Sequence, residues 1–216
     1  YIASSRTGKT LLWADGWGFA GCRPVDGDFN GDGSADQALW HPATGDWYIK
    51  TIQDQVLAMK VNWGFPGCVP VPGDYNGDHQ TDLAVWDNKT GNWYIRTLSG
   101  TSLKYAFNWG YPGCTPVPGD YDGDGVDDLA VYDPRTGDWY IATVGESVIA
   151  YKKNWGFPGC VPVSGDYAGD RGSDLNVYDQ LSGNWFILPL DGSKWIGFVN
   201  WGTPAMYPVG RRLGAA

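Results

Sequence analysis

The sequence predicts an all-β fold, a five-bladed β-propeller, on three observations. Trp-Gly recurs at an interval of 46 residues, the chain is rich in turn residues and aromatic residues, and no window shows a sustained helical apolar period. A period in the forties with strand-like content is typical of a propeller blade, a four-stranded unit that stacks on its neighbours around an axis. The tryptophans of the Trp-Gly pairs are Trp17, Trp63, Trp109, Trp155 and Trp201.

Composition agrees with this class. The 216 residues include 32 Gly, 14 Pro, 13 Trp and 13 Tyr, as expected for short strands joined by tight turns. Chains of this length often form one undivided all-β domain, so we expect a single domain spanning residues 1–216.

Each repeat predicts four strands in order. In the repeat 114–155, short apolar segments are separated by an Asp-rich loop, by an Asp-Pro-Arg-Thr-Gly turn and by a glycine-containing turn. The predicted strands lie at about 115–118, 129–132, 139–143 and 148–155. The same pattern fits the repeats 22–63, 68–109 and 160–201.

The two ends of the chain predict how the ring closes. Residues 1–18 match the third and fourth strands of a repeat, and residues 205–214 match the first strand. We therefore expect a composite fifth blade that lacks the second strand and the Asp-rich loop, with Arg212 in place of the first loop Asp. The alternatives are four full blades, or a fragment of a larger propeller.

The Asp-rich loop is a candidate calcium site. Oxygen side chains stand at its positions 1, 3, 5 and 9, a backbone carbonyl at position 7 and a turn residue, usually glycine, at position 6, which is what Ca²⁺ requires of a short loop. The predicted ligands are Asp28, Asn30, Asp32, Ser34 and Asp36 in the first loop; Asp74, Asn76, Asp78, Gln80 and Asp82 in the second; Asp120, Asp122, Asp124, Val126 and Asp128 in the third; and Asp166, Asp170, Gly172 and Asp174 in the fourth.

The four loops are not equal. The second has His79 at the turn position, and the fourth has Ala168 at position 3 and Arg171 at the turn, so we expect three or four Ca²⁺ ions with the fourth site the weakest. An EF-hand is excluded because position 12 is a strand residue instead of Glu. The alternative is a set of Asx turns that bind no metal.

One block of residues resembles a known family. Trp109-Gly110, Val117-Pro118-Gly119-Asp120 and the loop that follows, together with Asp128-Leu129-Ala130-Val131, are similar to the FG-GAP/VCBS repeat of integrin α-subunit propellers and bacterial surface proteins. The resemblance implies a propeller in which the loop ligands hold Ca²⁺ between the first two strands of a blade. The chain departs from the family in having Trp before the leading Gly and Tyr-Asp-Pro in place of Gly-Ala-Pro. Function does not follow from this fold, because propellers perform many functions.

Charge limits the partners. The net charge is −9 and no basic cluster is present, which excludes a nucleic-acid partner. More than half of the acidic residues lie at the loop positions, so the acidity indicates metal sites. No apolar run is long enough to insert into a membrane. Calcium loops of moderate affinity fill where the ion is millimolar, so we expect a secreted or cell-surface protein.

The four cysteines share one position of the repeat. They are Cys22, Cys68, Cys114 and Cys160, and the fifth position holds Met206. The exchange of Cys for Met favours free buried thiols. Disulfides near the axis and a ring of soft-metal ligands are the alternatives.

Repeated aromatic and amide side chains are the candidate ligand site. The Trp-Gly tryptophans are expected beside Pro/Gly crossovers, where they would line clefts between blades and stack on sugars; a role in the core between blades is the alternative. The candidates are Trp17, Trp63, Trp109, Trp155 and Trp201, with Asn62, Asn108, Asn154 and Asn200.

The function that these features favour is binding. The two histidines, His41 and His79, occupy non-equivalent positions and no nucleophile or zinc motif is present, so we expect no enzyme. The sequence predicts a calcium-stabilised, multivalent, lectin-like module whose partner is a glycan or a surface protein. The alternative is a protein-interaction or structural module of a larger extracellular protein or enzyme. No oligomeric state follows from the repeats.

Overall fold

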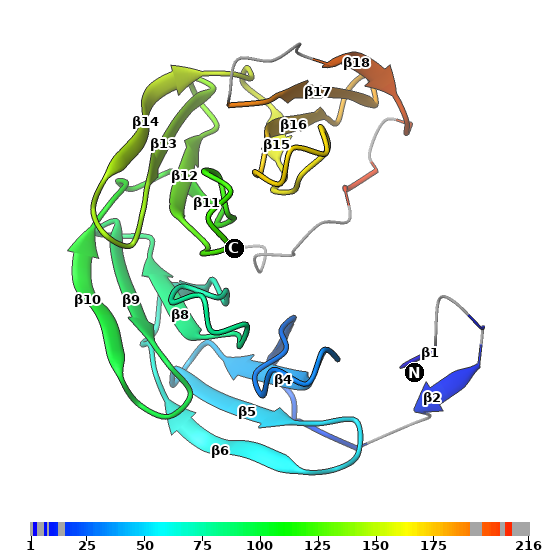
Figure 1. Cartoon of the computed structure of the whole chain (residues 1–216), viewed down its shortest axis with the longest axis vertical. Coiled ribbons are helices and arrows are strands. Elements are labelled where there is room, and N and C mark those ends of the chain that lie inside the picture. The colour runs from blue at the N-terminus through cyan, green and yellow to red at the C-terminus, as the bar shows by residue number, and fades with distance from the viewer. Residues whose placement is uncertain are drawn as a thin grey trace.

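The computed structural model describes residues 2–3, 7, 9–12, 16–190, 196–203 and 206–208. These residues form four four-stranded antiparallel sheets and one two-stranded sheet. The four larger sheets follow one another around an arc, with the Asp-rich loops on its inner side (Figure 1). The chain is therefore an all-β propeller, as the sequence predicts.

Within each blade the four strands pair in chain order, so that the chain runs outward from the centre before crossing to the next blade. Blade 1 contains β3 (Arg23–Val25), β4 (Gln37–His41), β5 (Asp46–Lys50) and β6 (Val56–Asn62). Blade 2 contains β7 (Cys68–Pro70), β8 (Leu83–Asp87), β9 (Asn92–Arg96) and β10 (Ser102–Asn108). Blade 3 contains β11 (Thr115–Pro116), β12 (Leu129–Asp133), β13 (Asp138–Ala142) and β14 (Val148–Asn154). Blade 4 contains β15 (Cys160–Pro162), β16 (Leu175–Asp179), β17 (Asn184–Leu188) and β18 (Ile196–Asn200).

These bounds confirm the four strands predicted for each repeat. The second and third strands are joined by a tight hairpin whose geometry follows from its sequence. In blade 3 the Gly137 N–H donates to the Asp133 carbonyl at 2.8 Å, and Gly137 has a φ of +79°, a left-handed conformation that glycine adopts without strain.

The prediction of a fifth, composite blade is wrong for the described residues. β1 (Ile2–Ala3) pairs with β2 (Thr10–Leu12) in a separate two-stranded sheet, and four complete blades are present. In every blade the first strand is hydrogen-bonded to the second strand. The predicted composite blade has no second strand, so the segment at 206–208 has no neighbouring strand of that kind to pair with. The rest of that predicted segment, residues 205 and 209–214, lies outside the described residues.

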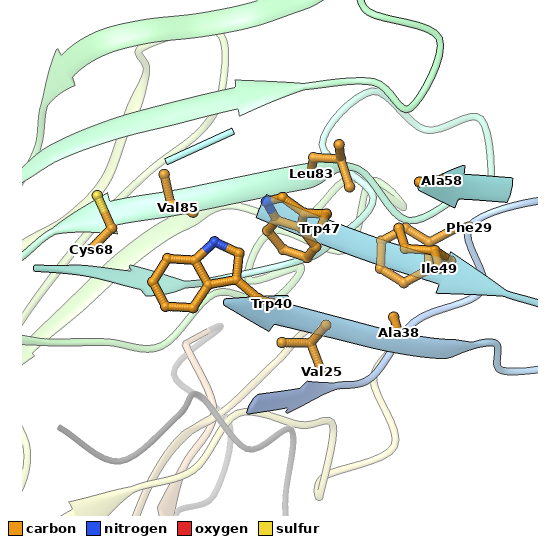
Figure 2. Close-up of a cluster of buried hydrophobic side chains, with 10 residues drawn as sticks. All are labelled: Val25, Phe29, Ala38, Trp40, Trp47, Ile49, Ala58, Cys68, Leu83 and Val85. Atoms are coloured by element: carbon orange, nitrogen blue, oxygen red, sulfur yellow. The ribbon is translucent and has the colours of Figure 1, made fainter. Parts of the chain in front are cut away.

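The core lies between the blades. Trp40 of β4 and Trp47 of β5 are fully buried and belong to one cluster with Leu83 and Val85 of β8, the second strand of the next blade (Figure 2). Because a second strand is covered on both sides by neighbouring sheets, all five residues of β8, β12 and β16 are buried. Among the described residues, no helix is long and apolar enough to cross a membrane.

Candidate functional site

The Asp120 loop closes around the carboxylate of its first residue. Oδ1 of Asp120 accepts the N–H groups of Gly123 and Asp124 at 2.7 and 3.1 Å, and Oδ2 accepts the N–H of Gly125 at 2.9 Å. Gly125 has a φ of +90°, which turns the chain back towards the blade. The loop therefore gathers its oxygen side chains on one side.

The other three loops repeat this arrangement. Asp28, Asp74 and Asp166 each accept the backbone N–H groups of the residues three, four and five positions further along. The left-handed turn at position 6 is kept even where glycine is absent, since His79 has a φ of +62° and Arg171 of +81°. A non-glycine residue in this region costs roughly 1–2 kcal/mol, so the rest of the loop holds the turn in place.

The carboxylate at the ninth position is buried in the second, third and fourth loops, as Asp82, Asp128 and Asp174, and partly buried in the first, as Asp36. Oδ2 of Asp128 accepts the Tyr121 N–H at 2.8 Å, and Asp82 makes the equivalent bond to the Tyr75 N–H at 3.0 Å. Burial, with repulsion from the other loop carboxylates, raises the pKa of Asp128 to about 7 and that of Asp82 to about 6.

The donor set fits a hard divalent cation. Ligand oxygens of Asp120, Asp122 and Asp124 lie within 4.8 Å of one another. Carboxylate oxygens of this kind, with a backbone carbonyl, are the ligands that Ca²⁺ prefers, and a bound ion would neutralise their charge. The predicted ligand Asp128 does not belong to this group of three side chains. The fourth loop has Ala168 at position 3 and so offers one side-chain oxygen fewer.

Most of the predicted ligand tryptophans bridge neighbouring blades. The indole N–H of Trp63 donates to the Tyr94 carbonyl of the next blade at 3.1 Å, and Trp109 makes the same bond to Tyr140 at 3.1 Å. Trp155 repeats it with Phe186 at 3.1 Å. Each of these residues is partly buried, so their polar edges serve the contact between blades.

The tryptophans at the two ends of the series differ. Trp17 donates to the Gln37 carbonyl at 3.1 Å, outside the pattern of the other three. Trp201 is 79% exposed, because among the described residues no fifth blade covers it. The other four Trp-Gly tryptophans are partly buried, so Trp201 is the most exposed of the five in the described part of the chain.

The predicted ligand asparagines also have partners within the protein. The Asn62 amide donates to the Thr44 carbonyl at 2.7 Å and to Asp46 Oδ1 at 2.9 Å, which fixes the outer strand to the hairpin beside it. The same two bonds are formed in the other three blades by Asn108, Asn154 and Asn200. Their amide donors are thus engaged in holding the blade.

Two exposed tyrosines lie beside the predicted ligand residues and were not predicted from the sequence. Tyr105 on β10 is 74% exposed and Tyr151 on β14 is 71% exposed. Tyr105 contacts Trp63 of the preceding blade and Tyr94 of its own, with ring centroids 6.4 and 5.3 Å apart. We call Trp63, Tyr94 and Tyr105 the Tyr105 shelf.

A second shelf repeats the first in the next blade. Tyr151 lies 6.5 Å from Trp109 and 5.3 Å from Tyr140, centroid to centroid. We call Trp109, Tyr140 and Tyr151 the Tyr151 shelf. Both shelves cross a blade boundary, and the signal for them in the sequence is a tyrosine that recurs after 46 residues in the fourth strand.

Bulges in the outer strands expose these tyrosines. The register shifts between Lys104 and Phe107 in β10, and Ala106 has a φ of +54°. β14 shows the same irregularity, with a φ of +53° at Lys152. Lys60 in β6 of blade 1 has the same conformation, with a φ of +60°, so the bulge is a feature of the repeat and the tyrosine side chain is what distinguishes the two shelves.

The shelves are not identical. The Arg96 guanidinium lies over the Trp63 ring, 5.4 Å from its centroid, and Ala142 takes its place in the Tyr151 shelf. Blade 1 has Met59 and blade 4 has Gly197 where the tyrosines stand, so the described chain has two aromatic shelves.

The four cysteines are free thiols, as favoured by the sequence. Cys68, Cys114 and Cys160 are buried and Cys22 is partly exposed. Burial raises the pKa of the Cys68 thiol to about 11, which keeps it protonated and unreactive at neutral pH.

Sheets and loops together define a class of protein: a repeat β-propeller with an Asp-rich loop between the first two strands of each blade. Residues 74–131, which contain the second and third loops, match the family described as FG-GAP-like repeat. This match over part of the chain, in a β-propeller of four-stranded sheets, confirms the resemblance to the FG-GAP repeat seen in the sequence. No curated protein sequence matches the chain.

Solved structures with a similar fold are distant in sequence. A protein of unknown function from Bacteroides caccae has a TM-score of 0.55 and 13% identity over 84% of this chain and 62% of its own. A lectin from Agrocybe aegerita, described as recognising non-reducing terminal N-acetylglucosamine, has a TM-score of 0.57 and 14% identity over 89% of this chain and 56% of its own. The chain thus spans less than two thirds of either structure, and the similarity shows the fold alone.

Proposed function

We propose that the chain is a calcium-stabilised carbohydrate-binding module that binds glycans through the Tyr105 and Tyr151 shelves. The observation that carries the proposal is the pair of exposed aromatic shelves, repeated in adjacent blades. The C–H face of a pyranose stacks on an aromatic ring, and a ring whose polar tip reaches water suits a wet binding surface.

The shelves revise the sequence-based list of ligand residues. In both, the tryptophan donates its indole N–H to the neighbouring blade, so its contribution to a ligand is its ring and its support of the tyrosine. The exposed tyrosine supplies the accessible face. Two shelves on one rigid domain would let weak single contacts add to a higher avidity.

Calcium and an extracellular location belong to the same proposal. Three loops with a complete oxygen set hold Ca²⁺ most tightly, and the fourth holds it weakly or not at all. Loops of this kind fill at the millimolar calcium found outside cells. Burial raises the pKa of the Cys68, Cys114 and Cys160 thiols, and buried, protonated thiols are compatible with an oxidising environment. The module performs no catalysis, and its role is recognition.

A glycan array is the first test, with N-acetylglucosamine as a probe because the Agrocybe aegerita lectin is described as binding it. Binding should weaken about fivefold in each of Tyr105→Ala and Tyr151→Ala, the factor that about 1 kcal/mol of aromatic contact gives. Met59→Ala changes the equivalent residue of blade 1 and is the matched control. Binding to no glycan, or equal binding by all variants, would refute the proposal.

A protein-interaction module is the second candidate, favoured by a different surface. Val199 and Trp201 at the end of blade 4 carry exposed apolar side chains, and so do Met206 and Tyr207 further along the chain. If the array shows no glycan binding, a Trp201→Ala variant tested for loss of a protein contact distinguishes this candidate.

A further inference from the structure

Each Asp-rich loop after the first contacts the loop of the blade before it. In the second loop, the Thr81 N–H donates to the Asp28 carbonyl at 2.6 Å, and the Thr81 hydroxyl accepts the Asp28 N–H at 2.9 Å. Thr81 is only 7% exposed, so both bonds are shielded from water. The backbone of Asp28 is therefore held on both sides by a residue from another blade.

The contact repeats around the arc. Asp127 in the third loop binds Asp74 in the same way. The Asp127 N–H donates to the Asp74 carbonyl at 2.7 Å, and Asp127 Oδ2 accepts the Asp74 N–H at 2.9 Å. Ser173 in the fourth loop donates its N–H to the Asp120 carbonyl at 2.5 Å. We call Thr81, Asp127 and Ser173 the clamp residues; each stands at position 8 of its own loop.

The clamp residues leave no room for a side chain on the glycine that precedes the first Asp of each clamped loop. A Cβ at Gly27 would lie 2.8 Å from Thr81 Oγ1, and a Cβ at Gly73 would lie 2.4 Å from Asp127 Oδ2. At Gly119 it would lie 2.7 Å from Ser173 Oγ. None of these three glycines has a left-handed φ, so the close approach of the clamp, and not the backbone conformation, requires glycine here.

The ends of the series lack the contact. Position 8 of the first loop is Ala35, which has no side-chain acceptor. The glycine before the fourth loop, Gly165, has a φ of +149°, and a Cβ there would meet Tyr167 of its own loop instead of a clamp residue. Clamps are thus present at each of the three boundaries between the four described blades.

The clamped residue is also the first ligand of its loop. Asp28 uses both carboxylate oxygens to organise the loop, and a shift of its backbone would move those oxygens away from the others. Thr81 does not contribute a ligand to its own loop, because its hydroxyl is engaged across the blade boundary. Its position is in turn held by Asp82, whose N–H donates to the Gly73 carbonyl at 2.7 Å.

We propose that each clamp residue is a positioning residue for the cation site of the preceding blade, so that the calcium affinity of a loop depends on the blade that follows it. This inference rests on the proposed binding of Ca²⁺. It assigns Thr81 to the Asp28 site, Asp127 to the Asp74 site and Ser173 to the Asp120 site. The Asp166 site has no clamp among the described residues, which adds to the effect of its missing ligand.

The test measures the dissociation constant of each Ca²⁺ site by competition with a chromophoric chelator. Thr81→Val keeps the shape of the side chain and removes the acceptor of the Asp28 N–H. It should weaken one site about fivefold, the effect of one hydrogen bond, and Thr81→Ser should restore the affinity. In an Asp28→Ala background, which lacks the first site, Thr81→Val should leave the remaining affinities unchanged.

Two further variants keep the test decisive. Gly119→Ala displaces the clamp residue of the third boundary, because Ser173 Oγ would lie 2.7 Å from the new Cβ, and it should weaken the Asp120 site. Ala35→Ser changes position 8 of the first loop, where no preceding loop is described, and should change no affinity.

The outcomes separate the two proposals. If the wild-type chain binds calcium but Thr81→Val leaves every site unchanged, or weakens a site in the Asp28→Ala background as well, the clamp is refuted and the calcium sites stand. A fall in the stability of the metal-free protein without a fall in affinity refutes it too. If the wild-type chain binds no Ca²⁺, both proposals fall together.

Discussion

Substitution of Gly91 by alanine tests how closely each hairpin approaches the crossover behind it. Gly91 has a φ of +78°, and a Cβ there would lie 2.3 Å from the Gly110 carbonyl oxygen and 2.6 Å from its carbon. Gly110 has little room to move away, because it packs against Val131 of the next blade. A Cβ built on Gly110 would lie 3.1 Å from Val131 Cγ1. The substitution therefore forces two backbone segments apart.

Gly113→Ala is the matched control for this change. Gly113 has a φ of +96°, and a Cβ there would have no neighbour within 4 Å, so alanine meets only the left-handed strain of roughly 1–2 kcal/mol. Gly91→Ala adds a backbone collision, and we expect a total loss of about 4 kcal/mol.

Urea denaturation followed by tryptophan fluorescence, at constant calcium, measures both free energies of unfolding. In a domain of this length each kcal/mol lowers the melting temperature by roughly 2–4 °C, so thermal melting gives an independent comparison. Equal losses for Gly91→Ala and Gly113→Ala would show that the hairpin and the crossover are not in contact, and would refute the reasoning.

Three other predictions follow from the structure. Calcium at a hundred times its dissociation constant should stabilise each occupied loop by about 2.7 kcal/mol, so a chelator should lower the melting temperature, and Asp120→Ala should reduce the bound metal measured by elemental analysis; no metal and no shift would contradict this. Although burial opposes it, hydrogen bonds from Arg135 and Tyr111 hold the pKa of Asp133 at about 2. Because this pKa is depressed, the stabilisation by ionised Asp133 is present above pH about 4 and is lost as the pH falls towards 2. The difference in unfolding free energy between wild type and Asp133→Asn should therefore shrink from about 2 kcal/mol at pH 7 to near zero at pH 2. A difference that does not change with pH would contradict the depressed pKa of Asp133. Asn176 is fully buried, and among the described residues its side-chain polar atoms form no hydrogen bond of standard geometry, the Tyr167 hydroxyl being a nearby polar group; the equivalent residues of the other blades are Ala38, Ala84 and Ala130. Asn176→Ala should therefore raise the free energy of unfolding by about 1 kcal/mol, and a destabilised variant in urea denaturation would show that the amide is satisfied.

The repeat explains how much of the fold could be predicted. Strand positions in the unit 114–155 follow from local signals, such as the Asp133 to Gly137 turn, which depend only on neighbouring residues. The oxygen positions of the loops are also local, since the first Asp binds N–H groups three to five residues further along. Patterns of this range are visible in a sequence.

The role of a repeated side chain is not local. Trp63 was predicted to line a ligand cleft, yet its indole N–H reaches the Tyr94 carbonyl 31 residues away, across a blade boundary. Periodicity identifies Trp63 as important without saying whether its partner is a sugar or the next blade. Tyr105 was overlooked because the bulge that exposes it arises from the mismatch between β9 and β10.

By itself, the sequence determined the all-β class, the 46-residue unit, the four strands of each blade and the oxygen set of each loop, because all of these depend on residues within one repeat. Only the tertiary structure decided that the described residues at the two ends form no fifth blade, that Tyr105 and Tyr151 are exposed, and that Thr81 clamps Asp28. These features depend on how one blade meets the next, and the contacts at that boundary join residues that are far apart in the chain.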